Sequence, residues 1–245
     1  MLVARAAPTL VAPLLAQPPG PERPVLLTPV IASRSVPRRW RVSSWALWRP
    51  GDAGPTSFGA GTLGGAQAGM RGTWDIAPDR LPRVAVAARL SSSLRRPGAE
   101  AAIGVEWQPV AAVPVRVLAE RRQRVSGDGR SAFALLAHGG MSDVALPLRF
   151  DLDAYGAAGV VGARRRDLFA EGAVTATRPI GPLKAGAGAW GGAQPGVARL
   201  DVGPTFALPL KLGPVNSRLS LDYRVRVAGE ASPGSGPALT LGADF

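Results

Sequence analysis

The last nine residues of the chain, Pro237 to Phe245, constrain its fold more than any other stretch. On one side of an extended segment the side chains are Leu239, Leu241, Ala243 and Phe245. The positions between them are more polar or small, and successive side chains of a β-strand point to opposite faces. Termini of soluble proteins usually fray into water, so an apolar aromatic end is unusual for that class. The pattern predicts the closing strand of a β-barrel, with these four side chains as its assembly signal.

The composition favours strands over helices. The chain of 245 residues contains 31 Gly, 24 Pro and no Cys. Glycine loosens helices and proline breaks them, and no segment keeps a helical period. No uninterrupted apolar run reaches the roughly 18 residues of a transmembrane helix, whereas barrel strands need only about 9–11 alternating residues. The absence of Cys also excludes disulfides and thiolate metal sites.

The net charge of +12, from 29 Lys and Arg against 17 Asp and Glu, would by itself suggest a nucleic-acid partner. The motifs that usually accompany nucleic-acid binding are missing from the sequence. There is no long basic helix, no aromatic-glycine ribonucleoprotein motif and no zinc-finger spacing. Because the charges are instead spread through alternating segments, we expect no nucleic-acid partner.

Alternation between apolar and polar residues recurs from Trp40 to the carboxy terminus. It is cleanest from Val215 to Val227, and Gly, Ala or Ser blur it in four segments, 40–49, 57–72, 130–138 and 182–192. The other predicted strands are 83–91, 99–107, 113–122, 146–153, 167–177, 198–206 and 237–245. Turn residues such as Pro and Gly separate them. The sequence predicts an all-β fold, an antiparallel up-and-down transmembrane barrel of about 12 strands that ends at Phe245.

The polar sides of these strands carry charges of both signs. A closed barrel would place them in a wet lumen and its apolar side against lipid, and closure removes strand edges that would aggregate. The alternative is a soluble basic β-sandwich that acts as a binding module. The residues expected to line the lumen are Arg89, Glu100, Glu106, Arg116, Glu120, Arg122, Asp151, Asp153, Glu171, Arg199, Asp201, Arg218, Asp222 and Arg224.

Tryptophans supply two further candidate roles. Trp48, Trp74 and Trp107 lie near predicted strand ends, which favours the aromatic girdle that barrels carry at the membrane interfaces. Trp190 falls on the polar side of a weakly patterned strand. It is a candidate for stacking on sugar rings in a pore.

Covalent chemistry has little support in the sequence. His138 is the only histidine, and although Ser131 and Asp143 are near it in sequence, no Gly-x-Ser-x-Gly elbow is present. Carboxylate pairs such as Asp151 and Asp153 could perform acid–base catalysis, but basic neighbours indicate lumenal ion pairs instead. We expect no enzyme activity, no catalytic residue, no metal site and no cofactor.

The chain divides into an amino-terminal segment, residues 1–37, and a barrel domain, residues 38–245. The first segment is rich in Pro and Ala, and either a weak signal peptide or a linker would explain it. With both barrel ends in the periplasm, basic connections are predicted to face outside, where lipopolysaccharide is phosphorylated; ordinary solvated loop charge is the alternative. These connections lie near Arg95 and Arg96, at 121–130, at 164–166 and at 230–237.

Several stretches resemble the carboxy-terminal domain of the bacteriophage adsorption protein A (NfrA) family across residues 40–245. They are Gly98 to Trp107, Val117 to Arg122, Gly129 to Phe133, Asp153 to Val161, Arg166 to Ala173, Gly186 to Gly196 and Arg199 to Pro204. The resemblance implies an outer-membrane barrel that follows periplasmic helical repeats in longer relatives, exports exopolysaccharide and serves as a phage receptor. This sequence lacks the helical repeats.

Three functional hypotheses follow. The first is an outer-membrane barrel for exopolysaccharide export or surface presentation, and the second is a narrow plugged barrel with a structural or receptor role. The third is the soluble basic sandwich. The partners expected for the first are outer-membrane lipid and lipopolysaccharide, the barrel assembly machinery, a polysaccharide and a periplasmic repeat protein.

Overall fold

The structure is a computed structural model that describes residues 39–51, 63, 65–76, 83–95, 98–110, 112–127, 130–163, 166–213 and 215–245. The signal peptide or linker predicted for residues 1–37 lies outside these residues. So do Arg96, Arg164 and Arg165 of the predicted outer connections and most of the stretch between 52 and 64.

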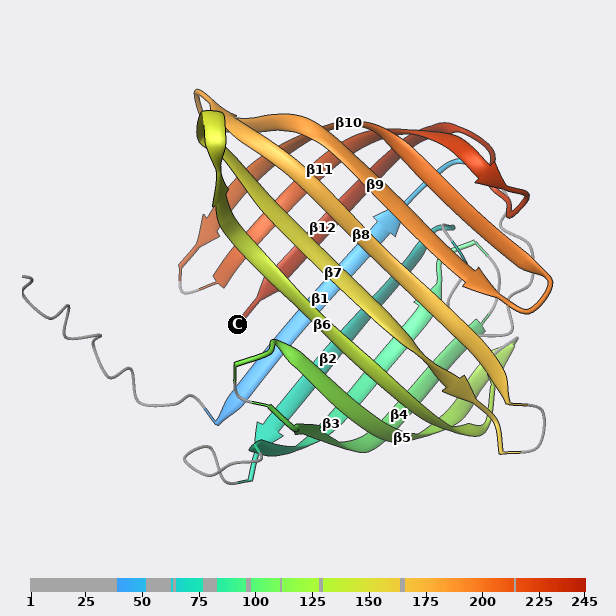
Figure 1. Cartoon of the computed structure of the whole chain (residues 1–245). Helices are drawn as coiled ribbons and strands as arrows, with labels where there is room; N and C mark the ends of the chain where they lie inside the picture. Colours follow the sequence, from blue (N-terminus) through green and yellow to red (C-terminus); the bar gives the residue numbers. More distant parts are fainter. Residues whose placement is uncertain are drawn as a thin grey trace, which may run out of the picture. The chain divides into compact units, whose positions relative to one another are not determined.

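Twelve strands make up the described part of the chain. They are β1 (Trp40–Trp48), β2 (Gln67–Asp75), β3 (Arg83–Ser93), β4 (Gly98–Gln108), β5 (Val115–Gly127), β6 (Ala132–Leu146), β7 (Phe150–Val161), β8 (Asp167–Ile180), β9 (Leu183–Gln194), β10 (Val197–Leu212), β11 (Val215–Gly229) and β12 (Gly236–Asp244). Every strand pairs antiparallel with its sequence neighbours, and β1 also pairs with β12. The sheet therefore closes into a barrel, which confirms the predicted fold and excludes the β-sandwich (Figure 1).

The seam between β1 and β12 is where the barrel closes. Ala46 pairs with Leu241, Trp48 pairs with Leu239, and the backbone N–H of Phe245 donates to the carbonyl of Val42 at 2.9 Å. The carboxy-terminal stretch thus forms the last strand, as the sequence predicts. Figure 1 shows this strand in dark red beside the blue first strand.

The barrel exposes its apolar side chains and buries its charged ones, which is the reverse of the arrangement in a soluble protein. On β11 the outer side chains of Leu221 and Tyr223 are 52% and 53% exposed, whereas Asp222 and Arg224 between them are 3% and 7% exposed. The same alternation runs around the barrel, because one face of every strand points into the lumen. Apolar side chains therefore cover the outside and charged side chains fill the inside.

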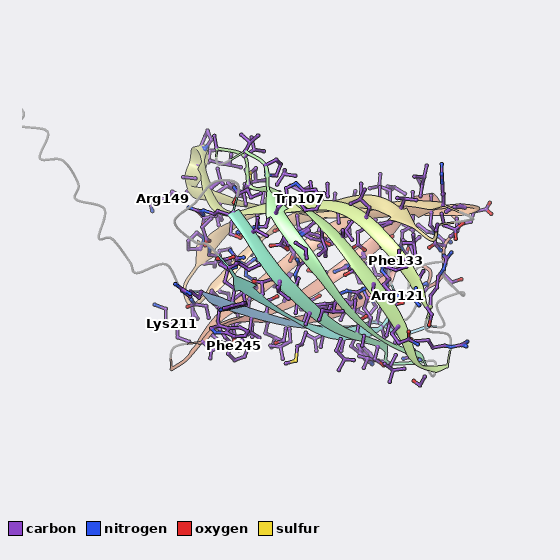
Figure 2. All side chains as sticks on the ribbon, turned by 90° about the horizontal axis from the view of Figure 1, so that it is seen from below. Trp107, Arg121, Phe133, Arg149, Lys211 and Phe245 are labelled. Atoms are coloured by element: carbon purple, nitrogen blue, oxygen red, sulfur yellow. The ribbon has the colours of Figure 1, made fainter. Side chains whose placement is uncertain are left out.

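The barrel has two distinct ends. We call the end where β1 begins and β12 finishes the terminal end, and the opposite end the loop end. The longest connection, residues 49–66, joins β1 to β2 at the loop end, as expected for an extracellular face. The connections at 94–97, 128–131, 162–166 and 230–235 also lie at the loop end, by the order of the strands. In Figure 2, Arg121 and Phe133 lie toward this end, while Lys211 and Phe245 lie toward the other.

The tryptophans predicted for a girdle all lie on the outer face near strand ends. Trp48 is near the loop end, whereas Trp74 and Trp107 are near the terminal end. Trp40 joins the second group, with its ring centroid 6.0 Å from that of Trp74. Both boundaries of the apolar surface therefore carry aromatic side chains, the arrangement that an interfacial girdle requires.

The predicted strand at 146–153 is wrong. Leu146 ends β6 and pairs with Phe150 at the start of β7, so the stretch is a tight hairpin with a 3-10 turn, η1 (Pro147–Arg149). Leu148 and Arg149 both have φ of 62°, which a continuous strand does not allow. The apparent alternation joined the end of one strand to the start of the next across a turn. No helix among the described residues is long and apolar enough to cross a membrane.

The second predicted strand, 57–72, is also displaced. The observed strand β2 runs from Gln67 to Asp75. Glycine and alanine give little contrast between the two faces of a segment, so the pattern did not fix where the strand begins. Beyond residue 72, Trp74 points outward and Asp75 inward, and this alternation identifies the true end of the strand.

Candidate functional site in the barrel lumen

Glu106 is the centre of a cationic cluster on the wall formed by β1, β2, β4, β5 and β6. Its carboxylate accepts a hydrogen bond from Arg116 at 2.7 Å and another from Arg71, and Arg41 lies 3.7 Å away. The Nε2 atom of His138 is 3.0 Å from its second oxygen. Glu106 itself is 2% exposed. One buried carboxylate thus holds four basic side chains from four different strands.

A second cluster lies nearer the loop end of the same wall. Arg89 donates to Glu100 at 2.9 Å and to Glu120 at 3.1 Å, and Arg122 donates to Glu120 at 2.7 Å. Buried ion pairs contribute little net stability because desolvation offsets their attraction, but they fix the positions of their members. Both clusters therefore hold long arginine side chains in defined places along the wall.

The opposite wall, on β10 and β11, has its own pairs. Asp201 accepts from Arg199 at 2.9 Å and from Arg49 at 2.8 Å, so the end of β1 is held to β10. Asp222 accepts from Arg224 at 2.8 Å and from the hydroxyl of Thr205 at 2.7 Å. The Thr205 contact joins the neighbouring strands β10 and β11, whereas Arg49, just after β1, reaches Asp201 past β12 and β11.

Near the terminal end, ion pairs extend between more distant strands. Arg218 of β11 donates to Asp153 of β7 at 2.7 Å, although β8, β9 and β10 lie between them in the sheet. Lys184 of β9 donates to Asp151 at 3.0 Å and to Asp143 at 2.8 Å. These side chains extend into the lumen at this end.

The structure places all fourteen residues predicted to line the lumen on the inner face. Thirteen take part in the ion pairs just described, and Glu171 accepts a hydrogen bond from the hydroxyl of Tyr155 at 2.9 Å. Period-two alternation is enough to assign a side chain to a face. It does not say which partner on another strand that side chain meets.

A cavity of about 760 Å³ occupies the lumen beside β1 to β8. Its charged lining comes from the two clusters around Glu106 and Glu120. Its apolar lining comes from Leu118, Leu136 and Phe169, together with Leu63 of the β1–β2 connection. Arg41 and Asp244 line it near the terminal end, and Gln67 lines it near the loop end. The cavity therefore follows much of the length of the barrel.

Trp45 is one of three aromatic residues in the cavity lining that the sequence did not reveal, the others being Tyr155 and Phe169. It lies on the inner face of β1, lines the cavity, and its ring covers Gly69, its neighbour on β2. On the other side its register partner is Gly242 of β12. Gly69 leaves the room for the flat ring against the wall, whereas a Cβ atom at Gly242 would meet nothing within 4 Å.

Trp190, the predicted sugar platform, also lies on the inner face but in different surroundings. The guanidinium of Arg224 stands 4.4 Å from the centre of its ring, a cation–π contact. Its ring also reaches back over Gly188, to within 2.6 Å of where a Cβ atom would be. Trp190 thus already has a cationic partner on the β10–β11 side, whereas Trp45 borders the cavity.

His138 does not meet the two residues considered with it for catalysis. The hydroxyl of Ser131 accepts from the backbone N–H of Arg124 near the loop end, and Asp143 is paired with Lys184 near the other end. His138 faces Glu106 between them. Among the described residues, no three His, Asp or Glu side chains are placed to hold a metal ion.

A closed antiparallel barrel with an even number of strands, an apolar outer surface and a charged interior defines a class of protein. Only helices and closed barrels satisfy all backbone hydrogen bonds in lipid, and bacterial outer membranes hold the barrels. The strands have 9 to 16 residues, enough to span that layer. The chain is an outer-membrane β-barrel protein.

No family model matches the chain, and no curated protein matches it. The similarity to the NfrA family therefore stays a resemblance. Solved structures do match: the beta domain of the Bordetella autotransporter BrkA has a TM-score of 0.42 and 14% identity over 84% of this chain and 97% of that one. LpxR from Salmonella typhimurium has a TM-score of 0.42 and 13% identity over 84% of this chain and 99% of that one. At these values the likeness concerns the fold alone.

Proposed function

We propose that the barrel is a narrow outer-membrane conduit for a glycan chain, in the manner of exopolysaccharide export. The observation that carries the proposal is the cavity of about 760 Å³, because its lining reaches from Arg41 near the terminal end to Gln67 near the loop end. A linear polymer needs a path of this kind. The resemblance to the NfrA family supports the same class of substrate.

The lining chemistry suits a sugar polymer. Trp45 offers a flat apolar surface, on which the apolar face of a pyranose ring stacks. The arginines and carboxylates of the two clusters supply donors and acceptors for hydroxyl and acidic groups. Ion pairing holds these groups at fixed positions, so a passing chain would meet the same contacts in each molecule. The role requires no covalent chemistry, and we propose that the protein is not an enzyme.

In this proposal the polymer enters from the terminal end. A periplasmic repeat protein is the proposed partner that delivers it there, since the barrels of the NfrA family, which the sequence resembles, follow such repeats. The barrel assembly machinery is the proposed partner during insertion.

The second candidate is a closed receptor barrel. The ion pair between Arg218 and Asp153 favours it, because that contact joins β11 to β7 across part of the lumen. Such a protein would act through its connections at the loop end, for example as an attachment site for a phage.

Electrical recording from planar bilayers separates the two candidates. For a conduit we expect discrete conductance steps from the purified full chain, blocked reversibly by acidic oligosaccharides. Trp45→Ala should weaken the affinity of the blocking oligosaccharide by up to about ten-fold, which is the contribution of one aromatic contact. Trp48→Ala is the matched control, because Trp48 lies on the same strand but faces outward. Absence of conductance steps, with normal insertion, would contradict the conduit and support the receptor.

A further inference from the structure

Arg121 is a cation on the lipid-facing side of the barrel. It lies midway along β5, and its guanidinium stands 4.8 Å from the centre of the ring of Phe133, which is near the loop end of β6 (Figure 2). Both side chains are exposed on the outer face. A charged group on this face is tolerated near the membrane interface and not at the bilayer centre. The position of Arg121 on the loop-end half of the barrel therefore fits the interfacial region of one leaflet.

An apolar groove of about 820 Å³ adjoins this pair on the outer face of β5 to β9. The exposed side chains of Leu135 and Leu168 rise beside it. Small residues form its floor, among them Ala137, Ala158 and Ala170. Because floor and walls are apolar and face the membrane, the groove has the chemistry of an acyl-chain site.

The strand register places one edge of the groove beside the cation, and the other edge reaches Gln194 and Pro195 at the loop end of β9. Arg121 pairs with Phe133, and the next outward position on β6 is Leu135, which lines the groove. A second basic residue, Arg166, is exposed at the same end, two residues before Leu168. Two basic side chains thus stand beside an apolar groove on the loop-end half of the outer face.

We propose that this surface binds one phosphorylated, acylated lipid of the outer leaflet, with a phosphate on Arg121 and an acyl chain in the groove. Arginine recognises phosphate by charge-assisted hydrogen bonds, and the Phe133 ring holds the guanidinium in place. The loop end carries the longest connection and faces outward, so the lipid is the phosphorylated lipid A of lipopolysaccharide. The site is separate from the lumen and does not rest on the proposed conduit.

The chain provides a matched control at its other end. Arg178 of β8 faces outward near the terminal end, 6.0 Å from the centre of the Phe150 ring. Its chemistry is the same as that of Arg121, but it stands at the opposite interface, away from the groove at the loop end.

Native mass spectrometry of the full chain in detergent tests the proposal with bisphosphorylated lipid A as the probe. We expect one tightly bound molecule, and Arg121→Gln should weaken it about ten-fold. Arg178→Gln should leave that affinity unchanged. Ala158→Phe, which fills the groove floor, should weaken it as well, and retained heat-modifiable mobility on gels would show that this variant is folded.

Three outcomes would overturn the proposal. The first is Arg121→Gln with the affinity of the natural sequence, and the second is dephosphorylated lipid A bound as tightly as the phosphorylated form. The third is equal binding of phosphatidylglycerol, which would show a general lipid surface and not an outer-leaflet lipid site.

Discussion

Arg218 on β11 and Asp153 on β7 form an ion pair of 2.7 Å although three strands separate them in the sheet. The contact is possible because the sheet closes and both side chains point into the same lumen. It extends into the lumen near the terminal end, where Lys184 and Asp151 form a further pair. A polymer in the conduit proposed above must pass this ion pair as well as the cavity beside β1 to β8.

Removing this pair should widen the path. We expect Arg218→Ala to raise single-channel conductance in planar bilayers, because the long side chain no longer reaches toward β7. Arg226→Ala is the control, since Arg226 is on the same strand but donates to the carbonyl of Ala231 at the loop end. Equal conductance of the Arg218 variant and the natural sequence would show that the pair is not the constriction.

Glu106→Gln should destabilise the barrel. The substitution removes the charge that holds Arg41, Arg71 and Arg116 together, and a poorly compensated buried polar group costs about 1–3 kcal/mol. Urea unfolding of the protein in detergent measures the change in the free energy of unfolding. Glu171→Gln, which affects one hydrogen bond from Tyr155, serves as the comparison and should change stability less. Similar losses in the two variants would argue against Glu106 as the centre of the cluster.

Gly69→Ala should displace the ring of Trp45 while residue 45 itself stays a tryptophan. A Cβ atom at residue 69 would overlap the indole ring, so the ring must leave the wall and enter the cavity. We expect a shift in tryptophan fluorescence together with a changed oligosaccharide block in bilayer recordings. Gly72→Ala on the same strand is the control, because a Cβ atom there meets nothing within 4 Å. An unchanged block in the Gly69 variant would mean that the Trp45 ring position does not matter to the conduit.

Deletion of Phe245 should impair assembly more than any binding activity. Its backbone N–H bonds to Val42 across the seam, and its side chain is exposed on the outer face. The deletion removes this last contact between β12 and β1, and with it an apolar anchor. Heat-modifiable protein in the outer-membrane fraction is the measurement, and Phe245→Tyr, which keeps an aromatic ring, should assemble normally. Normal insertion of the deleted chain would contradict the role of the terminal residue as an assembly signal.

Much of the fold could be predicted because alternation is a local property. The pattern of residues 215–227 predicts β11 from local sequence alone, since each apolar residue follows a polar one. Alternation does not locate a strand where the contrast between its two faces disappears, as in the Gly- and Ala-rich stretch before β2. Alternation also misplaces the strand boundary at Leu146 to Phe150. Here the apolar and polar positions of two strands stay in step across a turn, and only the backbone dihedrals reveal that turn.

The sequence by itself determined most of the strands, their even number, the polarity of the two faces and the closing role of the tail, because side-chain period and composition are local properties of the chain. Only the tertiary structure decided which charges meet. Glu106 gathers basic side chains from four strands, Arg218 reaches Asp153 past three strands, and Trp45 rather than Trp190 borders the cavity. These contacts depend on register and closure, which bring distant strands to face one another and leave no periodic trace in the sequence.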